Sequence, residues 1–255
     1  GEICISDTLS DTFAGIAGEQ CHSFYLQEAF LESDEKGNIK RSTPWQEAIN
    51  LGTYEYNNIP GKNTPLQTDF IFTANYQYTA TLATTICLSN QISGSSRSSR
   101  FNCPQTELIR STDFGIDAEH SPVTIQQMKK IVQSGDDQSY VDLLLEFLIV
   151  NRGGGMVVSP YERVSSNKQE GPILLTLSLD GEFIFECAPY PDFNLYLNPN
   201  GEANIVCRAT VPIDPLGQNA YLEANLQYGY SFIQAFGPVS IFPIPGNTPY
   251  RKPFF

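Results

Sequence analysis

The sequence predicts an all-β protein made of two tandem antiparallel β-sandwich domains with extended terminal segments. Three observations predict this fold class. The chain of 255 residues contains 13 Tyr and 16 Phe, which favour strands. Apolar and polar residues alternate with a period of two in several stretches, and turn sequences containing Asp-Gly or Asn-Gly separate them. Since the length suits two domains of ordinary size, we expect domains at residues 1–115 and 116–245, followed by a Pro-rich tail at 246–255.

Two nearly identical segments mark the clearest strands. Residues 74–78 read ANYQY and residues 224–228 read ANLQY, and each lies in a stretch with alternating character. In a strand, the Asn and Gln of each copy face one way and the Ala, central residue and Tyr face the other. We therefore interpret the two copies as an internal repeat that occupies equivalent strands of the two domains, with Tyr78 and Tyr228 buried.

Hairpin signals dominate the second half of the chain. Residues 171–190 show a strand, an Asp-Gly turn at 180–181 and a second strand. Residues 193–212 repeat the scheme around the turn sequence NPNG. Two successive hairpins are typical of an antiparallel sandwich.

The stretch at 121–160 permits two interpretations. Residues 141–150, VDLLLEFLIV, have helical propensity, and the residues after Pro122 could open an amphipathic helix. The polar turn SGDDQS and the glycine run at 153–155 favour strands instead. We expect two strands, with a buried helix packed on the sheet as the alternative.

Six cysteines form three close pairs along the chain, and neighbour pairing is the simplest arrangement. We expect the disulfides Cys4–Cys21, Cys87–Cys103 and Cys187–Cys207. This pattern indicates an extracellular protein, whereas buried free thiols in a cytosolic protein are the alternative. The sequence begins without Met, so we expect a mature product whose signal segment has been removed.

Charge and hydropathy exclude several classes of function. The formal net charge is −13, and the few basic residues are scattered, which argues against nucleic acid or an anionic membrane as a partner. The longest apolar run, at 141–150, contains Asp142 and Glu146 and is too short to span a bilayer. We therefore expect no membrane span in the mature chain.

The sequence contains no motif of a known catalytic class. A nucleophile elbow, a phosphate-binding loop and a HExxH helix are all absent, so we expect neither an enzyme nor a cofactor. With two histidines, no CxxC and no calcium-loop spacing, we expect no metal site either, although SDEKGN and SGDDQS could offer clustered oxygens to calcium. Trp45 and nearby tyrosines leave a sugar-stacking surface as an alternative.

The second half resembles a family of secreted proteins. The segments that carry the resemblance are SPVTI, the strand that ends at VNRGGG, the Cys-to-Cys segment at 187–207 and LEANLQYGY. Together they are similar to the immunoglobulin-like β-sandwich modules of archaeal S-layer and adhesion proteins, over residues 121–242. The resemblance implies tandem immunoglobulin-like domains in a structural or adhesive protein of the cell surface. Members of that family are often membrane-anchored, and no anchor is recognisable here.

The sequence thus favours an extracellular structural subunit that polymerises head-to-tail into a surface filament or lattice. Its partners would be copies of itself, with other cell-surface proteins or glycans as further candidates. We expect apolar residues near the two termini to make the contact between subunits by β-augmentation. These residues are Ile3, Ile5, Leu9, Phe13, Tyr250, Phe254 and Phe255. Alternatives are a soluble adhesin or carbohydrate-binding module, a secreted glycan-active enzyme, a filamentous viral coat, and termini that are disordered or fold back on their own domain.

Overall fold

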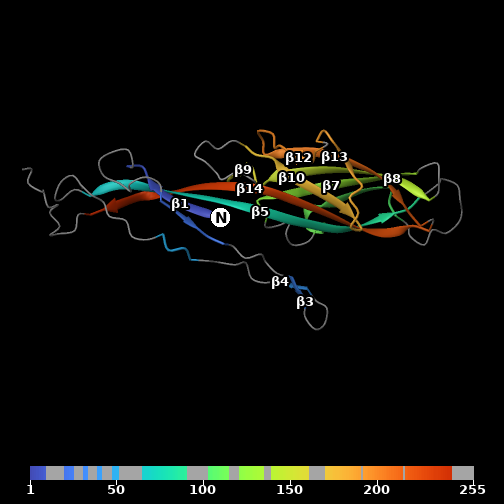
Figure 1. The fold of residues 1–255 in the computed structure, drawn as a ribbon, viewed down its shortest axis with the longest axis horizontal. Helices are drawn as coiled ribbons and strands as arrows, with labels where there is room; N and C mark the ends of the chain where they lie inside the picture. The colour runs from blue at the N-terminus through green and yellow to red at the C-terminus, as the bar shows by residue number, and fades with distance from the viewer. Residues whose placement is uncertain are drawn as a thin grey trace, which may run out of the picture. The chain divides into compact units, whose positions relative to one another are not determined.

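The computed structural model shows an all-β protein with two antiparallel sheets and a separate two-stranded hairpin (Figure 1). It describes residues 1–9, 20–25, 31–33, 39–41, 48–51, 65–90, 103–114, 121–134, 139–160, 170–190, 192–214 and 216–242. Within these ranges the helical content is one short 3-10 turn, η1 (Ser111–Asp113). The predicted all-β class is confirmed, while the tandem immunoglobulin-like arrangement stays a prediction.

The strands differ widely in length, from two residues to more than twenty. The first six are β1 (Glu2–Asp7), β2 (Gln20–Ser23), β3 (Leu31–Ser33), β4 (Ile39–Arg41), β5 (Leu66–Leu88) and β6 (Thr106–Arg110). The others are β7 (Val123–Ser134), β8 (Tyr140–Asn151), β9 (Met156–Val158), β10 (Ile173–Leu179), β11 (Glu186–Ala188), β12 (Asn194–Leu195), β13 (Glu202–Pro212) and β14 (Gln218–Ile241).

The chain divides into two compact units. Unit 1 comprises Gly1–Tyr76 and Ser231–Phe255, and unit 2 comprises Gln77–Tyr230. These units differ from the domains expected at 1–115 and 116–245. The reason is that β5 and β14 each contribute residues to both units, so unit 1 combines two stretches of sequence that precede and follow unit 2. The expected tail at 246–255 lies outside the described residues.

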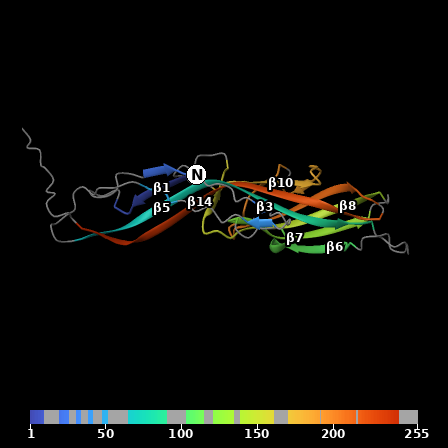
Figure 2. The ribbon, with the colours of Figure 1, turned by 90° about the horizontal axis from the view of Figure 1, so that it is seen from below.

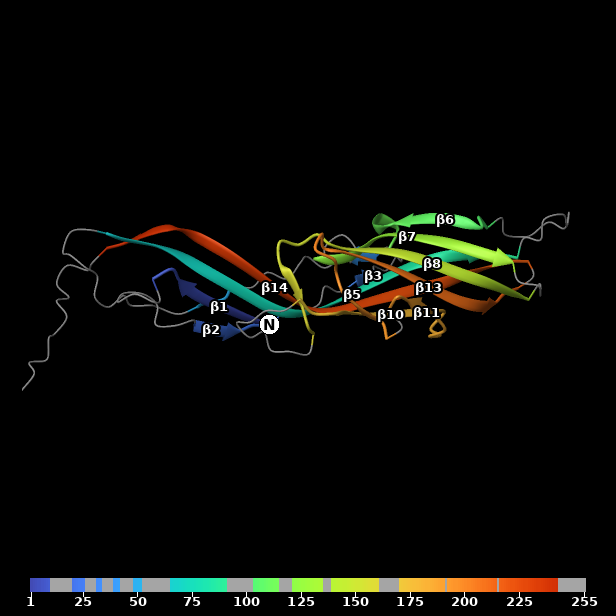
Figure 3. The same ribbon diagram turned by 90° about the horizontal axis from the view of Figure 1, so that it is seen from above.

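Unit 2 contains the five-stranded sheet, in the order β11-β13-β8-β7-β6 (Figure 3). Strands β7 and β8 form its centre and pair along their whole length. They arise from the ambiguous stretch at 121–160, so the expected strands are confirmed and the alternative helix is wrong. Side chains of β8 alternate up to Ile149, with Val141, Leu143 and Leu145 buried, because a strand with one face on the core needs this period.

The second sheet supplies the other strands of unit 2. Strand β10 pairs with β12 on one side and with β14 on the other, and β14 also pairs with β5. The expected Asp-Gly turn follows β10, with positive φ at Asp180 and Gly181, as a tight hairpin turn requires. The next strand differs from the expectation: β11 pairs with β13 in the five-stranded sheet instead of returning beside β10. The alternation was sufficient to predict the strands, but not which sheet each strand joins.

The sheet of unit 1 continues outward from β5. Strand β1 lies between β5 and β2 and pairs antiparallel with both (Figure 2). Ile5 is opposite Phe72 of β5, and Cys4 is opposite Cys21 of β2. Strands β3 and β4 pair only with each other among the described strands. The N-terminal strand therefore has partners on both edges within its own chain.

The two ANxQY segments lie in neighbouring strands of the same sheet, which corrects the expectation of equivalent strands in separate domains. The Tyr78 ring stacks on the Tyr228 ring with centroids 5.6 Å apart. Thr81 Oγ1 hydrogen-bonds Asn225 Oδ1 at 2.7 Å. Tyr228 is fully buried as expected, while Tyr78 is half-buried. A repeated pattern specifies which residues share a face, but it does not specify the partner strand.

Candidate functional site

The last part of β14 is the most exposed strand segment in the described part of the chain. Residues 233–240 are all exposed, and they include Ile233 at 56%, Phe236 at 55% and Val239 at 36%. The first part of the same strand alternates instead, with Leu222, Ala224, Leu226 and Tyr228 in the core. One strand thus passes from a packed sandwich into a segment that exposes side chains on both faces. We name residues 233–241 the edge segment.

The edge segment also has an open side. Strand β10 pairs with β14 from Leu222 to Gln227, and β9 lies next to it at Gly229. Beyond that point, no described strand pairs with β14 on the side away from β5. Soluble proteins usually protect such edges with charged residues, short strands or proline. The edge segment reads IQAFGPVSI, so Pro238 is the one protective residue and no residue is charged.

Contacts with β5 hold the other side of the edge segment in place. The Phe72 and Phe236 rings meet edge to face, with centroids 5.3 Å apart. Just before the segment, Ser231 Oγ lies 2.8 Å from Asn75 Oδ1 and donates a hydrogen bond to it. A Cβ at Gly237 would overlap the Asp69 carboxylate, so glycine permits the close approach of the two strands there. The exposed segment is therefore a strand that is paired on this side, with a cis peptide bond between Gly237 and Pro238.

The structure places three of the residues expected at subunit contacts. Ile5 is buried, and Ile3 and Leu9 are half-buried. Ile3 and Ile5 lie in β1, opposite Ala74 and Phe72 of β5. Both edges of β1 are paired within the chain, so this strand offers no free edge in the structure. Four further residues, Phe13, Tyr250, Phe254 and Phe255, lie outside the described residues, and their role in subunit contacts stays a prediction.

All three expected disulfides are present, and in the described part of the chain no cysteine is free. Cys4–Cys21 joins directly opposed residues of β1 and β2 in unit 1, and Cys187–Cys207 does the same for β11 and β13 in unit 2. Cys87–Cys103 joins the end of β5 to the segment before β6, with 5.3 Å between the Cα atoms. Each disulfide lies within one unit.

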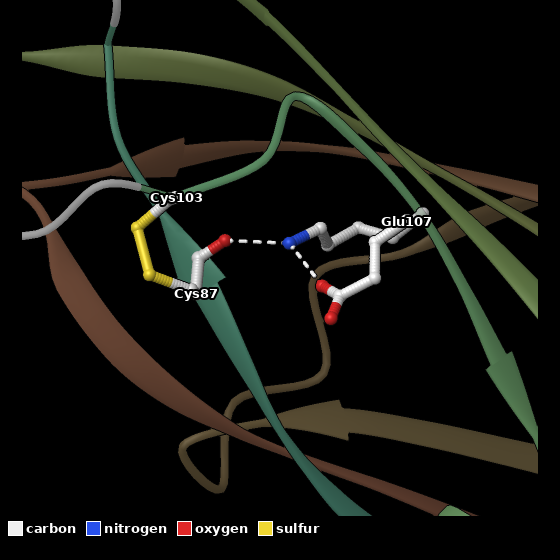
Figure 4. A network of polar contacts seen from close by, with 4 residues as sticks. Cys87, Cys103 and Glu107 are labelled. Carbon is white, nitrogen blue, oxygen red and sulfur yellow. Dashed lines mark hydrogen bonds and ion pairs between the residues drawn. A yellow bond between two sulfur atoms is a disulfide. The ribbon is translucent and has the colours of Figure 1, made fainter.

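A buried lysine lies beside the second of these disulfides (Figure 4). Lys130 is fully buried in β7, and its Nζ donates to the Cys87 carbonyl oxygen at 2.8 Å. The same Nζ lies 2.7 Å from a Glu107 carboxylate oxygen, and the Glu107 side chain is 39% exposed. Glu107 and Lys130 are directly opposed in β6 and β7. A buried ammonium group requires such partners, because it loses its hydration on folding.

Lys130 was not predicted as a site residue, although its inward position in an alternating strand sets it apart. In β7 the buried positions after the register shift are Met128, Lys130 and Val132, while Lys129 faces outward and pairs with Glu146 at 3.2 Å. A lysine at an inward position of an alternating strand is an exception to the pattern. This exception indicates a buried ion pair, although it does not identify the carboxylate partner.

A second polar cluster occupies the glycine run in unit 2. Tyr230 Oη accepts a hydrogen bond from the Gly155 N–H at 2.8 Å and lies 3.2 Å from Asn151 Oδ1. Burial of the phenol raises the pKa of Tyr230 above its ordinary value, against the opposing effect of these two hydrogen bonds. A Cβ at Gly153 would overlap the Tyr230 hydroxyl, so the run provides space for the tyrosine. The polar cluster around Tyr230 therefore has a structural role.

Two further features resemble ligand sites: a surface depression in unit 2 and a group of side chains in unit 1. An open depression of about 540 Å³ lies over β8 and β13, and its polar lining includes Asp142, Glu186 and Arg208. Asp142 accepts a hydrogen bond from Thr210 Oγ1 at 2.8 Å, so part of this lining is satisfied internally. In unit 1, the Glu2 side chain lies near the Cys4 and Cys21 sulfurs. Because these sulfurs are joined in a disulfide, they are not thiolate ligands for a metal.

Comparisons with protein-family models, with curated proteins and with solved structures found no match for this chain. The expected relation to archaeal cell-surface proteins therefore stays a prediction. Among the described residues, no helix has the length and apolar character needed to cross a membrane. Among the described surfaces of this chain, the edge segment stands out because residues 233–240 are all exposed.

Proposed function

We propose that this protein is an extracellular structural subunit that polymerises head-to-tail into a surface filament or lattice. The observation that carries the proposal is the edge segment of β14, an uncharged and exposed strand that has no paired strand on one side among the described residues and so supports association of this chain with further copies. An exposed strand of this kind favours pairing with another chain.

The disulfides support an extracellular location. Disulfides form and persist in oxidising compartments, and all six cysteines of the sequence are paired in them. Intracellular proteins of hyperthermophiles can also be rich in disulfides, so the extracellular location is part of the proposal. Cross-strand disulfides also suit a structural subunit, because they restrict the unfolded chain and so stabilise each unit.

The head-to-tail contact is assigned to a terminal segment. The C-terminal segment that contains Tyr250, Phe254 and Phe255 follows β14 directly along the chain. The N-terminal strand β1 already has both edges paired within its own chain. This arrangement favours the C-terminal residues as the connector. A contact between two different surfaces propagates through successive copies, as a filament or lattice requires.

An adhesin or carbohydrate-binding module is the second candidate. The depression lined by Asp142, Glu186 and Arg208 favours it, because charged and polar side chains around an open surface can bind the hydroxyl groups of a glycan. Other surface proteins or glycans would then be the partners. Trp45, the expected sugar-stacking residue, lies outside the described residues.

Electron microscopy of the purified full-length chain tests the proposal. We expect filaments or sheets from the wild type, and we expect Tyr250→Ser, Phe254→Ser and Phe255→Ser together to abolish growth. A matched control, Phe183→Ser, removes an aromatic side chain that is 72% exposed in unit 2 and should leave assembly unchanged. A monodisperse wild type at high concentration would contradict the proposal. Deletion of residues 1–18 is a poor test, since it removes β1 and Cys4 from the sheet of unit 1.

A further inference from the structure

We infer that the edge segment of β14 pairs antiparallel with the same segment of a second copy of this chain, around a two-fold axis. The inference names one contact of the proposed assembly and in that sense rests on the proposed function. It adds a contact that the head-to-tail interaction does not include.

The chemistry of the edge specifies a β-strand as the occupant. Figure 3 shows β5 along one side of this part of β14, and no described strand pairs with the other side. A regular strand presents a row of backbone N–H and C=O groups on each edge, and an unpaired row is a template for another strand. A ligand without a backbone could cover the apolar side chains, but it would not match this row.

Length selects the edge segment itself as the partner strand. Other strands that end a sheet in the described part of the chain are much shorter: β2 (Gln20–Ser23), β6 (Thr106–Arg110), β11 (Glu186–Ala188) and β12 (Asn194–Leu195). Of these, β6 and β11 also carry charged residues, which an uncharged apolar partner does not complement. The edge segment of a second copy has the required length and composition. Antiparallel pairing of identical strands needs no second surface.

Charge explains why the contact would form at this segment. The chain has a formal net charge of −13, so two copies repel each other over most of their surfaces. Residues 231–242 contain no charged side chain, whereas 17% of all residues are charged. Pairing at the edge segment therefore places no charged residues of the two paired strands opposite each other, and the nearest carboxylate, Asp69 beside Gly237, belongs to β5. It also removes Ile233, Phe236 and Val239 from water, at least in part.

The inferred contact is closed after two copies. A two-fold contact uses the same patch on both copies and leaves none of it free. It would join the sheets of two unit 1 copies into one continuous sheet, with β14 and its symmetry mate at the centre. Growth into a filament or lattice would still need the terminal head-to-tail contact. The two contacts can therefore fail independently in an experiment.

A cysteine scan of the full chain tests the pairing directly. Each position from 233 to 240 except Gly237, where a Cβ would overlap Asp69, is changed to Cys in turn and oxidised, and covalent dimers are measured on non-reducing gels. Because the native cysteines are all in disulfides, the new thiol is the one available for cross-linking. Residues near a two-fold axis face their own symmetry mates, so we expect one or two adjacent positions to cross-link strongly and the yield to fall on both sides. Uniformly weak cross-linking across the scan would overturn the inference.

A charge-insertion variant provides a second measurement. Ile233→Lys with Val239→Lys places four ammonium groups around the paired edges, and we expect dimerisation to weaken by at least about tenfold. The matched control, Phe183→Lys with Leu216→Lys, adds the same charge at exposed apolar sites of unit 2 and should leave dimerisation unchanged. Equal effects of the two variants would overturn the inference.

These results separate the inference from the proposed function. Polymers that form without any cross-link at 233–240 would refute the edge pairing and leave the proposed function standing. Cross-linked dimers without polymers at any concentration would support the edge pairing and refute polymerisation.

Discussion

Tyr228 connects the two sheets of unit 2 through its hydroxyl group. The Tyr228 hydroxyl accepts a hydrogen bond from the Val123 N–H at 3.1 Å, and its ring stacks on Tyr78 of the neighbouring strand. Val123 begins β7 in the five-stranded sheet, whereas Tyr228 lies in β14 of the other sheet. One fully buried side chain therefore holds two strands of one sheet together and fixes their position against the second sheet.

We predict that Tyr228→Ala lowers the free energy of unfolding by about 3–5 kcal/mol, because it leaves a large cavity and an unpaired backbone N–H. Tyr228→Phe keeps the ring and removes the two hydrogen bonds between its hydroxyl and the Val123 backbone, so it should cost about 1–2 kcal/mol. Urea unfolding followed by fluorescence or circular dichroism measures both. Equal costs would mean that the ring contributes little to the core.

The ion pair of Lys130 and Glu107 predicts that replacing its two members changes the free energy of unfolding by different amounts. Glu107→Gln leaves the buried ammonium group without a full counter-charge and should cost about 2 kcal/mol, below the range for pairs with both partners buried, since Glu107 is partly exposed. Lys130→Met fills a similar volume without a charge and should stay within about 1 kcal/mol of the wild type. Denaturant unfolding of both variants checks the order. A greater loss from Lys130→Met would show that the contacts of the ammonium group with Glu107 and the Cys87 carbonyl are together a net source of stability.

Gly153→Ala should destabilise unit 2 by about 1–3 kcal/mol, because the new methyl group would overlap the Tyr230 hydroxyl and force a local shift. Gly181→Ala is a useful comparison, since its Cβ would meet open space and the cost there arises from positive φ alone. The double variant Gly153→Ala with Tyr230→Phe should recover part of the loss, because the overlapping hydroxyl is gone. No recovery would place the strain elsewhere in the run.

The raised pKa of Tyr230 predicts a loss of stability at alkaline pH. Burial keeps the phenol neutral in the folded state to a higher pH than in the unfolded chain, where tyrosine titrates near pH 10. The resulting stability is complete below about pH 10 and is lost as the pH rises towards the raised pKa. The difference in unfolding free energy between the wild type and Tyr230→Phe should therefore shrink between about pH 8 and pH 11. A constant difference would show that the phenol does not contribute to this pH dependence.

Alternation and turn sequences were sufficient to predict β10 and β13, and the polar turn SGDDQS with the glycine run favoured strands over a helix for β7 and β8, because these signals are local in the sequence. The close spacing of the cysteines along the chain was likewise sufficient to predict all three disulfides. The exposed part of β14 was not predicted. Its sequence IQAFGPVSI resembles that of a core strand, and exposure depends on whether another layer covers it.

The sequence by itself therefore determined the all-β class, the faces of the main strands and the cysteine pairs, since each depends on neighbours along the chain. Only the tertiary structure decided that β5 and β14 pair with each other, that β11 joins the opposite sheet, and that Lys130 meets Glu107 inside unit 2. The physical reason is that strand pairing is non-local. Backbone hydrogen bonds between strands are the same for every sequence, so many partners are compatible with one alternating pattern. Packing of the chain selects among them, and among the described strands it leaves one side of the edge segment of β14 unpaired.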